Sequence, residues 1–250
     1  AAENKEQQLR RSRAETIAHE AQLKMLRYQL NPHFLFNTLN SISTLVLLKQ
    51  TERANAMLSR LSSFLRYTLA NEAIAQVTIE QEVETLKLYL EIEKMRFEDR
   101  LRPSFDIDPN IPDYLVGDNS RLAQILINLL DNSLKFTNEG EVTLTINLID
   151  NENDYSYLKF EVKDTGIGIA AEDQKLIFDN FVQLKNKLTP YQGTGIGLSI
   201  VHYLIDMFES KIEIESELGK GSTFYFTIKF KNRHFEDKIL NNVYVETKLL

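Results

Sequence analysis

Residues 121–136 read RLAQILINLLDNSLKF, and their pattern is the clearest structural signal in the chain. Apolar residues recur every three or four positions, at Leu122, Ile125, Leu126, Leu129 and Leu130, which predicts an amphipathic helix. Segments on both sides alternate apolar and polar residues and therefore predict strands. These segments are SFDIDP (104–109), EVTLTINLI (141–149), YLKFEVKD (157–164), KIEIES (211–216) and STFYFTIKF (222–230).

A second helical segment, GLSIVHYLIDMF (197–208), lies between the third and fourth of these strands. Helices and strands mixed over residues 101–231 predict an α/β sandwich, in which helices cover one face of a single sheet. Residues 232–250 show no clear pattern, and we treat them as a linker or tail.

The first 100 residues predict long helices, because they contain no glycine and only one proline, Pro32. Helical patterns run from about Leu9 to Lys49 and from about Thr51 to Phe97, and Pro32 should kink the first of them. Two such hairpins can bury their apolar stripes by associating. We therefore expect a long helical hairpin that forms a dimeric four-helix bundle, and an α+β fold class for the whole chain. The alternative is a helical spacer without chemistry.

The composition of the 250 residues excludes several classes of protein. With 0 Cys, neither a disulfide framework nor a thiolate metal site can form. The longest mainly apolar stretch, ISTLVLL (42–48), is far shorter than the ~20 residues that span a bilayer. The net charge is −7 and its acidic excess lies in residues 101–250, so we expect no nucleic acid partner. These features predict a cytoplasmic chain, or the soluble part of a longer, membrane-associated one.

Two glycine motifs indicate a phosphate-binding site. DTGIGI (164–169) follows a strand and GTGIGLSI (193–200) begins a helix. Glycine lets the backbone approach a phosphate closely, and a helix N-terminus offers unpaired amides. Each motif alone could be a tight turn. Neither matches the dinucleotide-binding or P-loop pattern.

Asn128 and Asn132 lie four residues apart, on one face of the predicted helix, and Lys135 follows on the same side. These polar groups face either solvent or a ligand, since burial without partners is costly. An asparagine oxygen suits Mg²⁺, and a lysine can meet a phosphate as a point charge.

Five motifs occur in a fixed order over about 100 residues: NSLKF, DTGIGI, IFDNFVQ, GTGIGLSIV and GKGSTF. Together they resemble the asparagine, glycine and phenylalanine boxes of bacterial two-component sensor histidine kinases. The resemblance implies a Bergerat ATP-binding sandwich with ATP and Mg²⁺ as cofactors. It makes Asn128 the Mg²⁺ ligand and Asp164 the acceptor of the adenine amino group.

The same resemblance assigns the flexible ATP lid to residues 185–192 and its anchors to Phe178 and Phe181. It also implies a set of residues that contact ATP. These are Asn128, Asn132, Lys135, Asp164, Gly166, Gly168, Gly193, Thr194, Gly195, Gly197 and Leu198.

The expected phosphoacceptor is His33 in NPHFLFN (31–37). Most helical histidines are structural, and His19, His202 and His234 have no motif around them. His33 follows the helix-kinking proline, and Asn37 lies one turn further on the same face, so we assign both to catalysis. NPHFLFN resembles the acceptor segment of the sensor subfamily related to autolysis and agr-type regulators. YLEIEKMRFEDRL (89–101) resembles the end of the second bundle helix in that subfamily.

The two halves resemble different subfamilies. Relatives with NPHFLFN usually carry an asparagine box closer to VENAIKHG and a shortened lid, whereas LLDNSLKFT (129–137) is typical of the orthodox group. A natural or engineered fusion near residues 113–118 would account for this. Glu209-Ser210, where a glycine pair often stands, is a second departure.

We therefore expect four regions. Residues 1–30 form a signal-relay, coiled-coil-like helix, and residues 31–100 form the dimerisation and histidine phosphotransfer hairpin. Residues 101–231 form the ATP-binding domain, and residues 232–250 follow as linker or tail. The resemblance implies an autophosphorylating protein-histidine kinase, a homodimer, that passes phosphate to a response-regulator receiver domain and whose upstream sensor domain is absent from this chain. The alternatives are an ATPase or serine-directed kinase of the same superfamily, or a non-catalytic scaffold.

Overall fold

The computed structural model describes residues 32–70, 79–97, 100–112, 115–152, 154–179 and 197–232. These residues fall into two compact units, which divide between Ala70 and residue 79. The expected relay helix (1–30), the expected tail (233–250) and the expected lid (185–192) lie outside the described residues.

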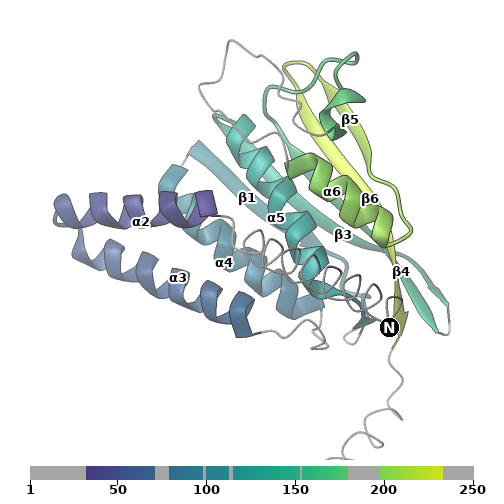
Figure 1. Cartoon of the computed structure of the whole chain (residues 1–250), viewed down its shortest axis with the longest axis horizontal. Helices are drawn as coiled ribbons and strands as arrows, with labels where there is room; N and C mark the ends of the chain where they lie inside the picture. The colour runs from purple at the N-terminus through teal and green to yellow at the C-terminus, as the bar shows by residue number, and fades with distance from the viewer. Residues whose placement is uncertain are drawn as a thin grey trace, which may run out of the picture. The chain divides into compact units, whose positions relative to one another are not determined.

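The first unit is a pair of helices, α2 (Pro32–Leu47) and α3 (Thr51–Ala70), joined by a short turn (Figure 1). In that turn Lys49 adopts a positive φ of 58°, and the amide of Gln50 donates to the carbonyl of Leu45 at 2.8 Å. The two helices bury apolar side chains between them, among them Phe34 and Phe64, whose rings meet edge to face at 5.3 Å. This pair shows a helical hairpin at residues 32–70, with a second helix shorter than the predicted Thr51–Phe97.

The second unit begins with α4 (Ile79–Phe97) and continues as a sandwich. Its strands and helices follow in the order β1 (Leu101–Ile107), β2 (Leu115–Val116), α5 (Asn119–Phe136), β3 (Gly140–Glu152), β4 (Tyr155–Asp164), the short 3-10 helix η2 (Leu176–Phe178), α6 (Gly197–Met207), β5 (Glu213–Glu217) and β6 (Gly221–Asn232). The strand order is β1-β3-β4-β6-β2, and β5 also pairs with β6. Among the described strand pairs, β1 and β3 run parallel, and the other four pairs (β3–β4, β4–β6, β5–β6 and β2–β6) are antiparallel.

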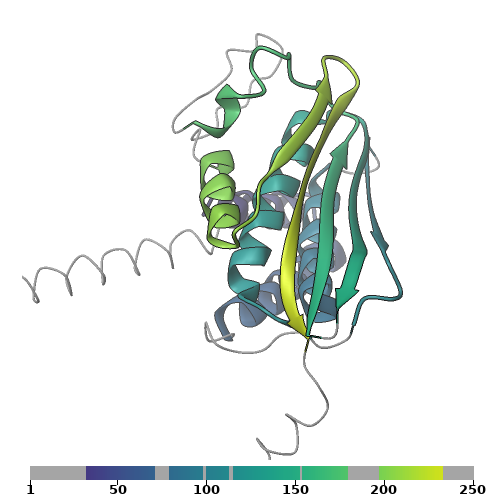
Figure 2. The same ribbon diagram turned by 90° about the vertical axis from the view of Figure 1, so that its right-hand side faces the viewer.

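Helices α5 and α6 lie on one face of this sheet (Figure 2). The alternation of the strands explains this arrangement, because one set of side chains is apolar and fully covered. The buried set includes Leu144 and Ile146 of β3, Phe160 of β4 and Phe226 of β6. The predicted strands and the one-sided helix layer are therefore confirmed, and the fold class is α+β.

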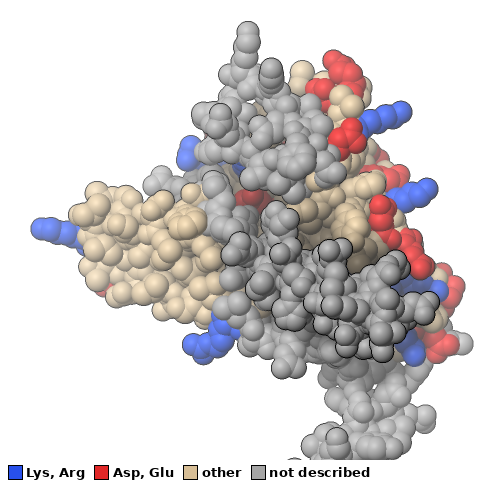
Figure 3. Space-filling view, in the orientation of Figure 1, with Lys and Arg blue, Asp and Glu red and all other residues tan. Residues whose placement is uncertain are grey.

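The opposite side of the sheet carries charged and aromatic side chains in contact with one another. The ammonium group of Lys159 lies 4.6 Å from the ring centre of Tyr225, and that of Lys229 lies 3.9 Å from the ring centre of Tyr155. Figure 3 shows acidic and basic side chains interspersed along the edge of this unit that carries β5. Partial exposure of this face explains its polar composition.

The position of α4 differs from the sequence-based expectation. We expected Thr51–Phe97 to be one helical segment of the hairpin, and the expected domain boundary lay at residue 100. In the structure Ile79–Phe97 is a separate helix that packs against α5 and β1 within the second unit. The stripe that includes Val83, Leu86 and Leu90 is indeed buried, but such a stripe does not specify its partner.

None of the described helices combines the length and apolar character needed to cross a membrane.

Candidate active site

The beginning of α6 meets the asparagine pair of α5. A β-carbon built on Gly197, the first residue of α6, would lie 3.9 Å from Asn128 Oδ1 and 3.9 Å from Asn132 Nδ2. Both asparagines are half-buried, as are Gly197 and Leu198. The first amides of an α-helix lack intrahelical partners and attract anions. The structure thus brings together two motifs that are more than 60 residues apart in the sequence.

Lys135 lies near the C-terminal end of α5, one turn after Asn132. Its side chain is half-buried, with Nζ 5.1 Å from the ring centre of Phe136. Burial lowers the pKa of Lys135, whereas the nearby Asp131 carboxylate raises it. A partly desolvated ammonium group on the helix that carries both asparagines is suited to bind a phosphate oxygen.

Asp164 ends β4 and is buried, with 6% of its surface exposed. Its Oδ1 accepts hydrogen bonds from the amides of Gly166 at 2.9 Å and Ser222 at 3.3 Å, and its Oδ2 accepts from Ser133 Oγ at 3.5 Å. Burial raises the pKa of Asp164, and these three hydrogen bonds partly oppose that rise. Oδ1 takes the two shorter hydrogen bonds, and Oδ2, beside its longer bond from Ser133, retains a lone pair that can accept from a ligand.

Gly168 is required by the backbone of the loop that follows Asp164. Its φ is +66°, and a β-carbon at this position would come within 2.0 Å of the carbonyl oxygen of Glu217. Gly166 is also closely packed, since its β-carbon would lie 2.4 Å from the carbonyl oxygen of Phe136. The glycines of DTGIGI therefore permit close approach of the loop to α5 and β5.

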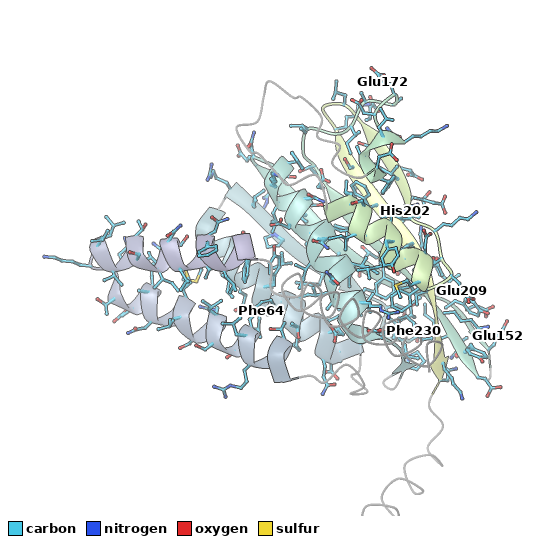
Figure 4. All side chains as sticks on the ribbon, viewed as in Figure 1. Phe64, Glu152, Glu172, His202, Glu209 and Phe230 are labelled. Carbon is cyan, nitrogen blue, oxygen red and sulfur yellow. The ribbon has the colours of Figure 1, made fainter. Side chains whose placement is uncertain are left out.

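Other expected site residues are described only in part. His33 lies in α2, but its side chain is outside the described part of the structure. Asn37 is half-buried one turn later. Phe178 lies in η2, 5.8 Å from the ring of His202 and 6.4 Å from that of Phe224 (His202 is labelled in Figure 4). Gly193, Thr194, Gly195 and Phe181 lie outside the described residues.

Sequence reasoning missed the residues that hold the site in place. Ser133 and Ser222 bind Asp164 from α5 and β6. Tyr89 of α4 donates a hydrogen bond to Asp131, whose carboxylate raises the pKa of Lys135 against the effect of burial. Ser133 and Ser222 stand inside recognised motifs, which is a weak signal, whereas nothing in the sequence around Tyr89 indicates its partner.

Two family models match the chain one after the other. Histidine kinase matches residues 21–101, and Histidine kinase-, DNA gyrase B-, and HSP90-like ATPase matches residues 117–232. The chain belongs to the two-component sensor histidine kinases. The second match contains all the asparagine and glycine motifs described above, and the first contains His33 and Asn37.

Named histidine kinases are similar to this sensor kinase over about half of its length or more. Hybrid signal transduction histidine kinase B of Dictyostelium discoideum is 45% identical over 123 residues, which are 49% of this chain and 6% of that protein. Sensor histidine kinase RcsC of Escherichia coli K12 is 38% identical over 133 residues, 53% of this chain and 14% of that protein. The chain thus spans a small part of the curated relatives it matches.

Among solved structures, full-length ShkA in complex with AMPPNP is 29% identical, with a TM-score of 0.55. The similarity covers 73% of this sensor kinase chain and 37% of ShkA. The mycobacterial sensor histidine kinase MprB, at 19% identity and a TM-score of 0.50, shares the fold. The resemblance of the sequence motifs to sensor histidine kinases is therefore confirmed.

Proposed function

We propose that this chain is an ATP-dependent, autophosphorylating protein-histidine kinase core. The observation that carries the proposal is the meeting of Asn128, Asn132 and the start of α6, with Lys135 on the same helix. Phosphoryl transfer depends mainly on positioning and charge neutralisation, and these groups supply both. ShkA, which was solved in complex with AMPPNP, supports a nucleotide as the ligand.

ATP would be bound through both of its ends. Asp164 would accept a hydrogen bond from the adenine amino group, next to Gly166 and Gly168. The amides of residues 193–198 would bind the phosphates, with Asn132 and Lys135 at the triphosphate. Burial raises the pKa of Asp164, and three hydrogen bonds that favour its carboxylate form partly oppose that rise.

The residues present also fit Mg²⁺. Asn128 offers the carbonyl oxygen of a half-buried side chain beside the helix start, and no cluster of three acidic or histidine side chains lies among the described residues. Mg²⁺ takes few protein ligands when phosphates and waters complete its shell. When bound, the ion would neutralise charge on the phosphate oxygens.

The reaction would transfer the γ-phosphoryl group to His33. A neutral imidazole nitrogen forms the new N–P bond while the bond from the γ-phosphorus to the bridging oxygen breaks, and ADP leaves with the electron pair. The ring proton passes to solvent. With an ordinary histidine pKa of ~6.5, most of the imidazole is neutral at pH 7. Asn37, one turn along α2, would orient the ring.

The phosphoryl group would then pass to an aspartate of a response-regulator receiver domain, as two-component membership implies. We propose residues 31–100 as the phosphotransfer region, although α4 packs within the second compact unit, and residues 101–231 as the ATP-binding domain, in the cytoplasm where ATP is available. The proposed junction between subfamilies, residues 113–118, overlaps residues 102–116, which lie between the two matched regions.

A homodimer through α2 and α3 is part of this proposal. Several large apolar side chains of α2 are exposed, including Phe36 at 68%, Leu39 at 50% and Leu47 at 81%. The visible face of this hairpin carries few charged side chains (Figure 3). A second hairpin would cover these side chains in a four-helix bundle.

Labelling with γ-³²P-ATP tests the proposal. We expect acid-labile, alkali-stable label on the wild-type chain, and none on His33→Ala or Asn128→Ala. His234→Ala, outside every motif, should keep the label. Label that persists in His33→Ala would reject this acceptor, and nucleotide turnover without labelled histidine would favour an ATPase.

Mixed His33→Ala and Asn128→Ala subunits that regain label together would show transfer between subunits. Absence of Mg-ATP binding by calorimetry would indicate a non-catalytic scaffold.

A further inference from the structure

Gln174 connects two segments that border the candidate nucleotide pocket. It lies just before η2, and its Nε2 donates to the carbonyl of Ile169 at 3.1 Å and to the carbonyl of Ser216 at 2.9 Å. Ile169 is the last residue of DTGIGI, and Ser216 belongs to β5. One half-buried side-chain amide therefore uses both of its protons to hold the loop against the strand.

Ser216 reinforces this connection through its hydroxyl group. Its Oγ accepts from the amide of Ile169 at 2.8 Å and lies 3.0 Å from the carbonyl of Gly221 and 2.9 Å from Ser222 Oγ. A serine has only one proton to donate. Because the Gly221 carbonyl can only accept, Ser216 donates to it, and Ser222 donates to Ser216.

This network continues to Asp164. The amide of Ser222 donates to Asp164 Oδ1 at 3.3 Å, so Gln174, Ser216 and Ser222 form one hydrogen-bonded path to the buried carboxylate. The backbone of the 164–169 loop also contacts residues 219–221 directly. The amide of Gly219 donates to the carbonyl of Ile167 at 2.7 Å, and a β-carbon on Gly221 would lie 2.0 Å from the carbonyl oxygen of Asp164.

We propose that Gln174 and Ser216 are positioning residues for ATP binding: they clamp the 164–169 loop onto the β5–β6 turn and so fix Asp164 and the glycine amides. This inference rests on the proposed function. Both residues act through the loop rather than through the reacting atoms. Neither belongs to the residues that the family motifs assign to the nucleotide.

The test uses the full chain and two variants. Gln174→Met removes both donated hydrogen bonds at similar volume, and Ser216→Ala removes the hydroxyl. Ser104→Ala is the matched control, because Ser104 also shares a 2.9 Å hydrogen bond with a hydroxyl, that of Thr143 on a neighbouring strand. Calorimetry with Mg-AMPPNP gives Kd, and the labelling reaction gives KM and kcat separately.

We expect Gln174→Met and Ser216→Ala to raise Kd and KM about tenfold, the factor for one to two neutral hydrogen bonds, with kcat within about twofold. The double variant should be less than additive, because both changes release the same loop. Ser104→Ala should leave Kd unchanged. Unchanged Kd in both variants, with only a lower melting temperature, would overturn the inference.

Two outcomes separate this inference from the proposed function. If the wild-type chain does not bind Mg-AMPPNP, the proposed function fails first. If the wild type binds and the variants bind equally well, only the positioning role fails. Should Gln174→Met not fold, Ser216→Ala alone decides the question, since it removes a smaller side chain and leaves the Gln174 bond to the Ser216 carbonyl.

Discussion

The hydroxyl of Tyr89 donates to Asp131 Oδ1 at 3.3 Å and links α4 to α5 across 42 positions of sequence. Tyr89 is fully buried, and Asp131 stands next to Asn132 on the helix that carries the candidate site. The Asp131 carboxylate also raises the pKa of Lys135 against the effect of burial. Through this one hydrogen bond α4 contributes to the environment of the predicted phosphate-binding lysine.

Tyr89→Phe tests the strength of this link. The change removes the hydrogen bond but keeps the buried ring, so we expect the free energy of unfolding to fall by about 1 kcal/mol. Urea denaturation followed by circular dichroism measures it. Tyr203→Phe on α6 is the control, because Tyr203 is 65% exposed. Equal losses in the two variants would show that the Tyr89 hydroxyl contributes nothing specific.

Glu82 of α4 predicts a pH-dependent stability. Its side chain is buried, its Oε2 has no hydrogen-bond partner, and burial raises its pKa from 4.5 to about 7. Between these two values the folded state binds more protons than the unfolded state, so the free energy of unfolding falls as pH rises. The loss reaches about 3 kcal/mol above pH 7, because a tenfold change in proton affinity corresponds to about 1.4 kcal/mol.

Glu82→Gln should therefore stabilise the chain at pH 8 and change little at pH 4.5, where Glu82 is largely protonated in the folded state and little of the pH-dependent loss of stability has accumulated. Urea denaturation across this range measures the difference. Glu84→Gln is the matched control, because Glu84 is exposed and pairs with Lys87. A wild-type stability that stays flat from pH 5 to pH 8 would contradict the prediction.

The sequence predicted the sandwich better than it predicted α4. Strict alternation in β3 and β4 leaves one choice of buried face, so strand positions and the covered side followed directly. The apolar stripe of α4 could be buried equally well by a long helix or by α5 and β1, and only the fold decides. Likewise the spacing of Asn128 and Asn132 located the site, but the support from Gln174 and Ser216 depends on contacts between residues 42 positions apart.

Phe34 and Phe36 should separate folding from association in the hairpin. Phe34 is 2% exposed and packs on Phe64, so Phe34→Ala should cost about 3–5 kcal/mol of stability. Phe36 is 68% exposed, so Phe36→Ala should spare the helix content but weaken the proposed dimer. Circular dichroism and sedimentation velocity measure the two effects. A Phe36→Ala chain that dimerises as tightly as wild type would place the interface elsewhere.

Gly168 and Gly219 offer a comparison of two left-handed glycines. Gly219 has a φ of +82° and open space around it, so Gly219→Ala should cost only backbone strain, about 1 kcal/mol. Gly168→Ala adds a collision with the Glu217 carbonyl at 2.0 Å, which should cost a further 1–3 kcal/mol, approximately. Thermal unfolding measures both. Nucleotide affinity should fall only in Gly168→Ala. Similar melting temperatures of the two variants would show that the 164–169 loop can shift away from Glu217 without loss of stability.

Asp164 should make nucleotide affinity depend on pH. An ionised carboxylate accepts more strongly from the adenine amino group than the protonated acid does, and burial raises the pKa of Asp164 above the ordinary 3.8. As pH falls, protonation therefore competes with the ligand earlier than it would at an exposed aspartate, and Kd for Mg-AMPPNP should rise.

Asp164→Asn identifies the source of that pH dependence, because the nucleotide phosphates titrate as well. An amide cannot ionise. If its oxygen keeps the hydrogen bonds from Gly166 and Ser222, its NH₂ group takes the place of Oδ2 and cannot accept from the adenine amino group, so affinity should fall about tenfold or more at pH 7.5. The Kd of this variant should then vary with pH only as the phosphates do, while Asp150→Asn, an exposed change on β3, should follow the wild type. If wild type and Asp164→Asn show parallel curves, Asp164 does not bind the base as its ionised form, and the adenine pocket must lie elsewhere on the sandwich.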